Sequence, residues 1–157
     1  MPRIPNNMRP LFLKGLPSSR VLKQYANLND IANFQNSAYK FPKVSKLELT
    51  FKKMNAYGHM GARQFWKYNL RTITFHNPQL NIDVKRVDCE TKEEQLACPS
   101  VLTVHFQNGS KKTIDCKNVH SSEIMNQLIE ISDAIRVPKE EIPILTQEGH
   151  EERLAKA

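Results

Sequence analysis

The hydrophobic period of the chain changes from that of a strand to that of a helix within residues 44–70. Leu47, Leu49 and Phe51 alternate with polar or charged residues, which is the two-residue period of a strand buried on one face. After a glycine-containing loop at 55–61, the apolar residues of 62–70 recur at helical spacing. A second strand is predicted at 81–87, so we expect a strand–helix–strand crossover that joins parallel strands.

A hairpin and a further helix complete the predicted domain. Asn108-Gly109 separates two β-type runs, 101–106 and 111–116, and this pair favours a type I′ turn because both of its residues need φ > 0. Ser121 or Ser122 is then predicted to cap a helix whose last turn lies near Arg136. The expected fold class is α/β, with a four-stranded mixed sheet in the thioredoxin-like layout and a basic N-terminal extension.

The chain divides by composition into three predicted segments. Residues 1–43 form a basic N-terminal arm and a helix that starts at Ser18 or Ser19, residues 44–137 form the thioredoxin-like domain, and residues 138–157 form a charged tail. No apolar run approaches the roughly 18–20 residues that a spanning helix needs, so we expect no membrane insertion.

Positive charge is concentrated in the first half of the chain. Residues 1–86 contain 15 of the 23 lysines and arginines but only three acids, which gives a net charge of +12. Residues 87–157 carry a net charge of −5. Concentrated like charge works against compactness, and a block of this kind usually serves a polyanion, most often nucleic acid. We therefore expect RNA to bind the N-terminal half.

The sequence offers little to support catalysis or a metal site. Redox chemistry on a thioredoxin-like fold needs Cys-x-x-Cys at a helix N-terminus, and the corresponding residues 58–62 contain no cysteine. Paired Cys-x₂₋₄-Cys zinc ligands are also absent, although Cys116 and His120 have ligand-like spacing and Cys89, Cys98 and His105 could approach one another across the sheet. No glycine-rich phosphate loop is present. We expect neither an enzyme nor a cofactor, metal ion or small-molecule substrate.

The order and spacing of several short motifs resemble one protein family. Leu47-Glu-Leu-Thr-Phe51 is followed by a glycine-containing loop, by Gly61-Ala-Arg-Gln-Phe65 at the start of a helix, and by Asn77-Pro78 before a strand. This arrangement, over residues 44–135, is similar to the thioredoxin-like family of mitochondrial ribosomal proteins that also includes a small accessory subunit of respiratory complex I. With its long basic N-terminus, the chain looks most like the fungal member of the mitochondrial large ribosomal subunit.

The resemblance implies a structural constituent of the mitochondrial ribosome, in the matrix, which supports mitochondrial translation and contacts ribosomal RNA and neighbouring ribosomal proteins. It implies RNA contacts at Arg63, Lys67, Arg71, Lys52 and Lys53. Charge and aromatic content extend the predicted RNA-binding set to Arg3, Arg9, Lys14, Arg20, Lys23, Lys40, Lys43, Lys46, Tyr57 and His59.

Two other functions remain open at this point. A complex I accessory subunit of the same fold would have protein partners and no evident use for the basic arm, and a thioredoxin-like enzyme would need the absent Cys-x-x-Cys. The acid-free composition of residues 1–29 is typical of an organellar transit segment as well as of an arm that orders against an acidic partner.

Overall fold

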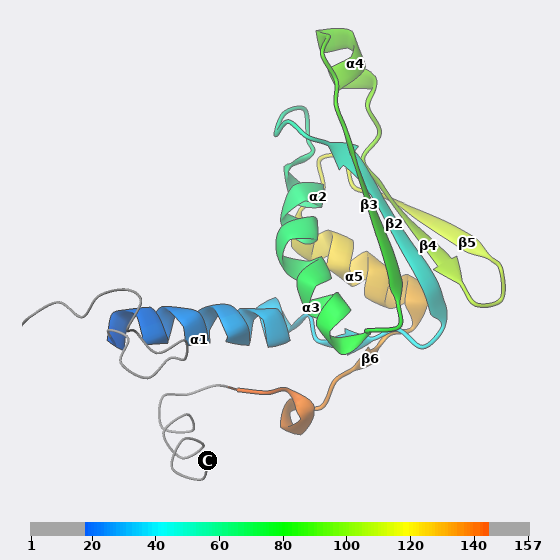
Figure 1. Ribbon diagram of the computed structural model, residues 1–157. Helices are drawn as coiled ribbons and strands as arrows, with labels where there is room; N and C mark the ends of the chain where they lie inside the picture. The colour runs from blue at the N-terminus through cyan, green and yellow to red at the C-terminus, as the bar shows by residue number, and fades with distance from the viewer. Residues whose placement is uncertain (1–17, 145–157) are drawn as a thin grey trace, which may run out of the picture. The chain divides into compact units, whose positions relative to one another are not determined.

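A four-stranded sheet in the order β3-β2-β4-β5 organises the computed structural model, which describes residues 18–144 (Figure 1). The central strand β2 (Val44–Lys52) pairs in parallel with β3 (Asn81–Val87) and antiparallel with β4 (Val101–Phe106). The edge strand β5 (Lys111–Asp115) pairs antiparallel with β4. The predicted mixed sheet and its parallel crossover are therefore confirmed.

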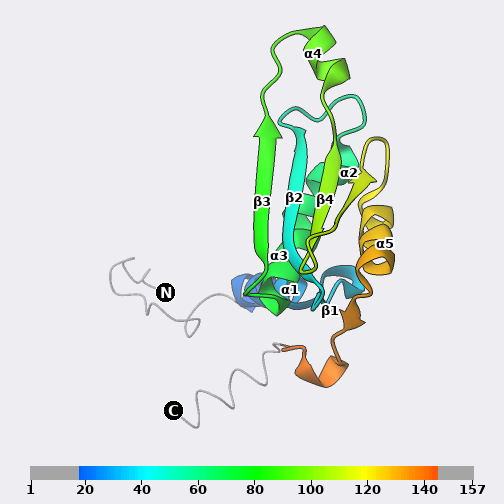
Figure 2. The same ribbon diagram turned by 90° about the vertical axis from the view of Figure 1, so that its right-hand side faces the viewer.

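Helices cover one face of this sheet, and the other face is left open within the described residues (Figure 2). Leu47, Leu49 and Phe51 are buried beneath the helices, as their alternation predicts. The residues between them face the opposite way, where Glu48 lies opposite Asp83 on β3 and Thr103 on β4. The hydrophobic core thus lies between the sheet and a single layer of helices.

The crossover helix is longer than the predicted segment 62–70. It runs as α2 (Met60–Gln64), a π-helical turn (Phe65–Asn69) and α3 (Leu70–His76), and Asn77 ends it. Ala62, Phe65 and Ile73 are fully buried against the sheet. The extra turns after residue 70 escape the sequence prediction because the segment 71–76 is mostly polar, and its buried Thr72 gives no hydrophobic signal.

The C-terminal helix α5 (Ser121–Ser132) ends earlier than predicted. Asp133 takes a left-handed conformation (φ 50°), and the chain turns into a short strand, β6 (Ile135–Arg136). This strand pairs antiparallel with β1 (Tyr39–Lys40), so the end of the predicted N-terminal segment 1–43 belongs to a second small sheet. The predicted serine cap is also wrong, because the side chain of His120 accepts the N–H of Ser122 at 3.2 Å.

Two local predictions on the hairpin side need correction. The hairpin forms, but only Gly109 of the Asn-Gly pair has positive φ (86°), so the turn is not type I′. The sequence pattern predicts no helix between β3 and β4, but α4 (Lys92–Ala97) forms there, and its N-cap Thr91 and Glu94 form a reciprocal capping box. The spacing Thr-x-x-Glu is a recognised helix-start signal and could have identified this helix.

The remaining elements are short or lie at the ends of the described chain. The predicted first helix is confirmed as α1 (Ser18–Asn33), whose residues 18–29 belong to a compact unit distinct from residues 30–142. Three-residue 3-10 helices occur at Phe34–Asn36 and Lys139–Glu141. No helix among residues 18–144 has both the length and the apolar character needed to cross a membrane. The three predicted segment boundaries stay a prediction.

Asn77 connects the end of α3 to residues 39–41 through side-chain hydrogen bonds, and its replacement is expected to destabilise the fold. Its side chain accepts the N–H of Phe41 at 2.9 Å and donates to the carbonyls of Tyr39 (2.8 Å) and Ile73 (2.9 Å). Asn77→Ala would leave these buried or part-buried backbone groups unpaired, so we expect it to lower the free energy of unfolding by about 2 kcal/mol. Urea unfolding would measure this loss, and a wild-type value would contradict it.

Candidate nucleic-acid interface

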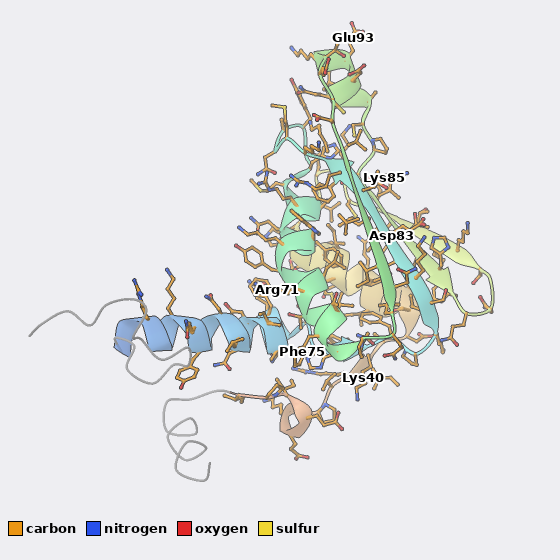
Figure 3. The ribbon with its side chains drawn as sticks, in the orientation of Figure 1. Lys40, Arg71, Phe75, Asp83, Lys85 and Glu93 are labelled. Carbon is orange, nitrogen blue, oxygen red and sulfur yellow. The ribbon has the colours of Figure 1, made fainter. Side chains whose placement is uncertain are left out.

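Three basic residues, here called the helix row, lie along the helical segment from α2 to α3. Arg63, Lys67 and Arg71 are spaced four residues apart, and within residues 18–144 none of them forms an ion pair with a carboxylate. Positions four apart drift around a regular α-helix, which has 3.6 residues per turn. The π-helical turn at 65–69 holds more residues per turn and so counteracts this drift. Arg71 projects from α3 away from the sheet (Figure 3).

A groove of about 500 Å³ runs beside this basic row, between α3 and the edge strand β3. Its floor is largely apolar, and its lining includes Trp66, Lys67, Leu70, Arg71, Thr74, Leu80, Ile82 and Val84. The Arg86 guanidinium lies 4.9 Å from the centre of the Trp66 ring, which is itself packed against Phe51. An apolar floor with a cationic rim can accept a flat nucleobase while the rim contacts its phosphate.

An aromatic pair lies next to the same row. The rings of Phe34 and Tyr68 stack with their centres 4.9 Å apart, and the Lys67 ammonium lies 5.3 Å from the centre of the Tyr68 ring. Both rings are partly exposed. Aromatic faces beside a lysine can stack on unpaired bases of RNA.

Four other lysines of the predicted set are engaged in ion pairs. Lys40 pairs with Glu141 (3.1 Å), Lys43 with Asp133 (2.9 Å), Lys53 with Asp88 (3.0 Å), and Lys46 with both Glu48 and Asp83. Three of the five carboxylates in these pairs come from residues 87–157, so the two halves of the sequence are not two separate faces. The pairs of Lys40, Lys43 and Lys53 are exposed and therefore weak, but all of these pairs reduce the local positive potential around the lysines.

Two residues of the predicted set are buried, and we correct their assignment. Lys52 is 1% exposed, with its Nζ 3.5 Å from the carbonyl oxygen of Gln95 and 4.6 Å from the centre of the Tyr57 ring. His59 is fully buried and accepts the backbone N–H of Lys52 through Nδ1. Burial, and then the charges of Lys52 and Lys117, lower the pKa of His59 and favour its neutral form. Neither side chain reaches solvent, so neither can contact RNA in this conformation.

The other residues predicted to contact RNA do not lie beside the helix row. Tyr57 is 40% exposed in the β2–α2 loop, where it covers the Lys52 ammonium. Arg20 and Lys23 lie on α1 in the other compact unit, and Arg3, Arg9 and Lys14 lie outside the described residues. The groove and the stacked pair Phe34–Tyr68 were not predicted, because they bring together residues up to 34 positions apart in the sequence.

The ion-pair network on the open sheet face is expected to make the stability of the fold depend on pH. Glu48 contacts Lys46 and His105, and the hydrogen bonds from these two groups, Lys46 first, lower its pKa from 4.5 to about 2. A carboxyl whose pKa is lower in the folded state contributes stability above its ordinary pKa and loses it as the pH falls towards 2. We therefore expect the free energy of unfolding to fall less steeply between pH 5 and 2 in Glu48→Gln than in wild type. Denaturant midpoints across that range would show it, and parallel curves would contradict it.

Two of the three cysteines are neighbours: the Cys98 thiol lies in contact with Cys89, and burial first and then this contact raise the pKa of Cys98. Cys89, Cys98 and Cys116 are all free and buried, and burial raises the pKa of Cys116 to about 12. Cys116 is fully buried while His120 caps α5 at the surface. Within residues 18–144, no three histidine, cysteine, aspartate or glutamate side chains come together in a way that could hold a metal ion.

Comparisons with known proteins give matches in both a family and individual relatives. Residues 62–121 match the family described as the mitochondrial ribosomal protein L51/S25/CI-B8 domain. The chain is 37% identical over 100 residues to the large ribosomal subunit protein mL61 of Saccharomyces cerevisiae, covering 64% of this chain and 72% of that protein. It is 25% identical over 122 residues to mL61 of Neurospora crassa, covering 60% of this chain and 58% of that protein.

Proposed function

This chain belongs to the family of mitochondrial large-subunit ribosomal proteins with the L51/S25/CI-B8 domain, and from that membership we propose that it binds ribosomal RNA through its helix row. It is a mitochondrial protein and not an enzyme, as the names of its relatives indicate. Both relatives are large-subunit ribosomal proteins, so the ribosomal branch of the family is favoured over the complex I branch. We further propose that the protein supports mitochondrial translation as a structural constituent.

The RNA proposal depends mainly on one observation: the helix row, Arg63, Lys67 and Arg71, lies beside an apolar groove. These three cations have no carboxylate partner within residues 18–144, whereas four other lysines of the predicted set do. A cation that is not already paired releases more counterions when it meets a phosphate, and this release drives RNA binding. Trp66 and the stacked pair Phe34–Tyr68 supply aromatic faces for bases at the same place.

We propose that the sheet is thioredoxin-like and serves as a scaffold rather than as a redox centre. The order β3-β2-β4-β5, with a crossover helix and a final helix on one face, supports this layout. Residues 58–62, where a catalytic Cys-x-x-Cys would lie, contain Gly58 and Gly61 but no cysteine. A basic N-terminal extension that reaches RNA remains part of the proposal, carried by Arg3, Arg9, Lys14, Arg20 and Lys23.

Titration of the full chain with fragments of large-subunit ribosomal RNA tests the proposal. We expect the affinity to fall steeply as salt increases, because several phosphates are neutralised at once. Fluorescence anisotropy at a series of salt concentrations gives both the dissociation constant and the slope. An affinity that does not depend on salt, or that is equal for an RNA fragment and a neutral polymer, would overturn the proposal.

A further inference from the structure

The groove beside the helix row leaves apolar surface open to a ligand. Leu80, Ile82 and Val84 line it on the β3 side, where they pack against the core and yet stay partly exposed, and Leu70 lines it on the helix side. Trp66, the only tryptophan of the chain, lines the groove as well. An open groove of about 500 Å³ with an apolar lining is typical of a site that accepts the apolar part of a ligand.

The charges around the groove are suited to an anion. Lys67 and Arg71 line it, and the Arg86 guanidinium lies 4.9 Å from the ring centre of the lining tryptophan. Within residues 18–144 none of these three cations forms an ion pair with a carboxylate. Asp83, the only acid of β3, pairs with Lys46 on the open face of the sheet at 2.8 Å, and no described residue that lines the groove is acidic. We therefore expect a ligand that combines a negative charge with an apolar surface.

An unpaired nucleotide combines these two properties. In a duplex the faces of the bases are stacked on one another, so phosphates, sugars and base edges are what a protein reaches. An unpaired base can turn out of the strand and lay its face on an apolar surface while its phosphate stays at the cations. An acidic protein segment would match the charges too; we favour RNA because a protein of the large ribosomal subunit resides in a particle built on it.

The polar groups of the groove do little to distinguish one base from another. The Thr74 hydroxyl donates to the carbonyl of Leu70 at 2.8 Å, so towards a ligand it can only accept a hydrogen bond. Lys67 and Arg71 can only donate. Each of the four bases carries at least one N–H donor for a single acceptor, so we expect the groove to recognise the unpaired state of a base rather than its identity.

We propose that the groove binds the base of a single unpaired nucleotide of ribosomal RNA, with Lys67 and Arg71 at the phosphate of that nucleotide. Trp66 is already held between the Phe51 ring (5.7 Å between ring centres) and Arg86, so a base that contacts it does not have to order it first. This assignment depends on the RNA binding proposed for the helix row and adds the kind of RNA selected there: a strand with an unpaired base rather than a regular duplex.

Two matched RNA hairpins test the assignment on the full chain. They share one stem, and only the first carries a single bulged adenosine. We expect the bulged hairpin to bind at least tenfold more tightly at about 0.1 M salt, because contact of one base with aromatic side chains strengthens binding by about this factor. The emission of Trp66 should change with the bulged hairpin and not with the paired one. Replacing the bulged adenosine by uridine should alter the affinity by about threefold at most, since stacking tolerates every base.

The same titrations separate a failure of this assignment from a failure of the RNA proposal. Equal affinity for the two hairpins, with a steep dependence on salt for both, would overturn the groove assignment and leave RNA binding by the helix row in place. Affinities that do not depend on salt would overturn both.

Filling the groove tests where the base binds. Thr74→Phe adds a ring to an exposed residue of the groove lining without changing the charge, and this variant is expected to bind the two hairpins equally. Thr113→Phe makes the same change at an exposed residue of β5, outside the groove, and should keep the preference for the bulged hairpin. A preference that survives in Thr74→Phe, or that is lost in both variants, would contradict the assignment.

Crosslinking within the assembled particle identifies the occupant. A photoreactive phenylalanine analogue replaces Thr74 in the full chain, and the same analogue replaces Thr113 as the control. In purified large subunits we expect position 74 to crosslink to one unpaired nucleotide, which reverse transcription of the RNA would map. A crosslink to a protein segment or to a base-paired nucleotide, or a yield no higher than at position 113, would refute the proposal.

Discussion

Replacing Arg63, Lys67 and Arg71 together by glutamine is expected to weaken binding to large-subunit ribosomal RNA on the order of 100-fold at about 0.1 M salt. Each cation that meets a phosphate releases condensed counterions, and at this salt concentration one such contact contributes somewhat less than a factor of ten. The slope of log K against log salt should become shallower by about 2 to 3 for the same reason. None of the three side chains belongs to the hydrophobic core, so their replacement should change the thermal stability little.

The matched control removes the same charge elsewhere. Lys85, Lys111 and Lys139 are exposed, lie outside the predicted RNA-binding set, and form no ion pair within residues 18–144. Their triple replacement by glutamine lowers the net charge equally, and we expect a much smaller loss of affinity. Equal losses in the two triple variants would show that net charge, and not the helix row, accounts for RNA binding.

Gly61→Ala is expected to lower the free energy of unfolding by about 3 kcal/mol. A Cβ atom at this position would lie 1.7 Å from the carbonyl oxygen of Val119 and 2.9 Å from its carbonyl carbon. Both atoms are backbone, so the loop before α5 would have to move away from α2. Helix propensity predicts the opposite sign, because alanine within a helix is favoured over glycine by about 1 kcal/mol. The sign of the measured change therefore distinguishes the two effects.

Gly109→Ala provides the control with the same chemical change. A Cβ at Gly109 would meet nothing within 4 Å, but φ is +86°. We expect a loss of about 1 kcal/mol from the backbone conformation alone. Urea unfolding of both variants compares them directly. A Gly61→Ala protein as stable as wild type would mean that the loop at 118–120 adjusts without cost.

The same close approach explains the glycines at both ends of Gly58-His-Met-Gly61. Gly58 has φ +88° and accepts the N–H of Asn118 at 2.9 Å. Both glycines therefore let the β2–α2 loop pack against the loop that precedes α5. Since the helix row begins with Arg63, two residues after Gly61, this packing also orients the proposed RNA-binding surface.

Most elements of the sheet were predictable because their signals are local. The alternation of Leu47, Leu49 and Phe51 identifies β2, the segment 81–87 is β3 as expected, and the apolar runs around Asn108-Gly109 form the hairpin. Each of these signals depends on residues that are neighbours in the chain, and side-chain period and turn preference are local properties. The helix α4 was missed although its capping box is also local.

The candidate interface was only partly predictable, and the reason is distance along the chain. The basic row was expected from the family resemblance, and a single helical segment carries all of it. The groove beside it needs α3 and β3 together, and the ion pairs of Lys40 and Lys43 need carboxylates about 100 and 90 residues away. The sequence shows charge as a linear density, whereas binding depends on which charges remain unpaired in space.

Local periodicity therefore specified the four strands of the main sheet, the crossover and the presence of α1 and α5, whereas α4 and the short strands β1 and β6 were not predicted. Only tertiary packing decided that Lys52 and His59 are buried, that Gly61 admits no side chain, and that the first half of the chain loses part of its positive charge to acids of the second. Burial and ion pairing arise between residues far apart in sequence, and these residues meet only when β2 is enclosed by β3 and β4 beneath the helices.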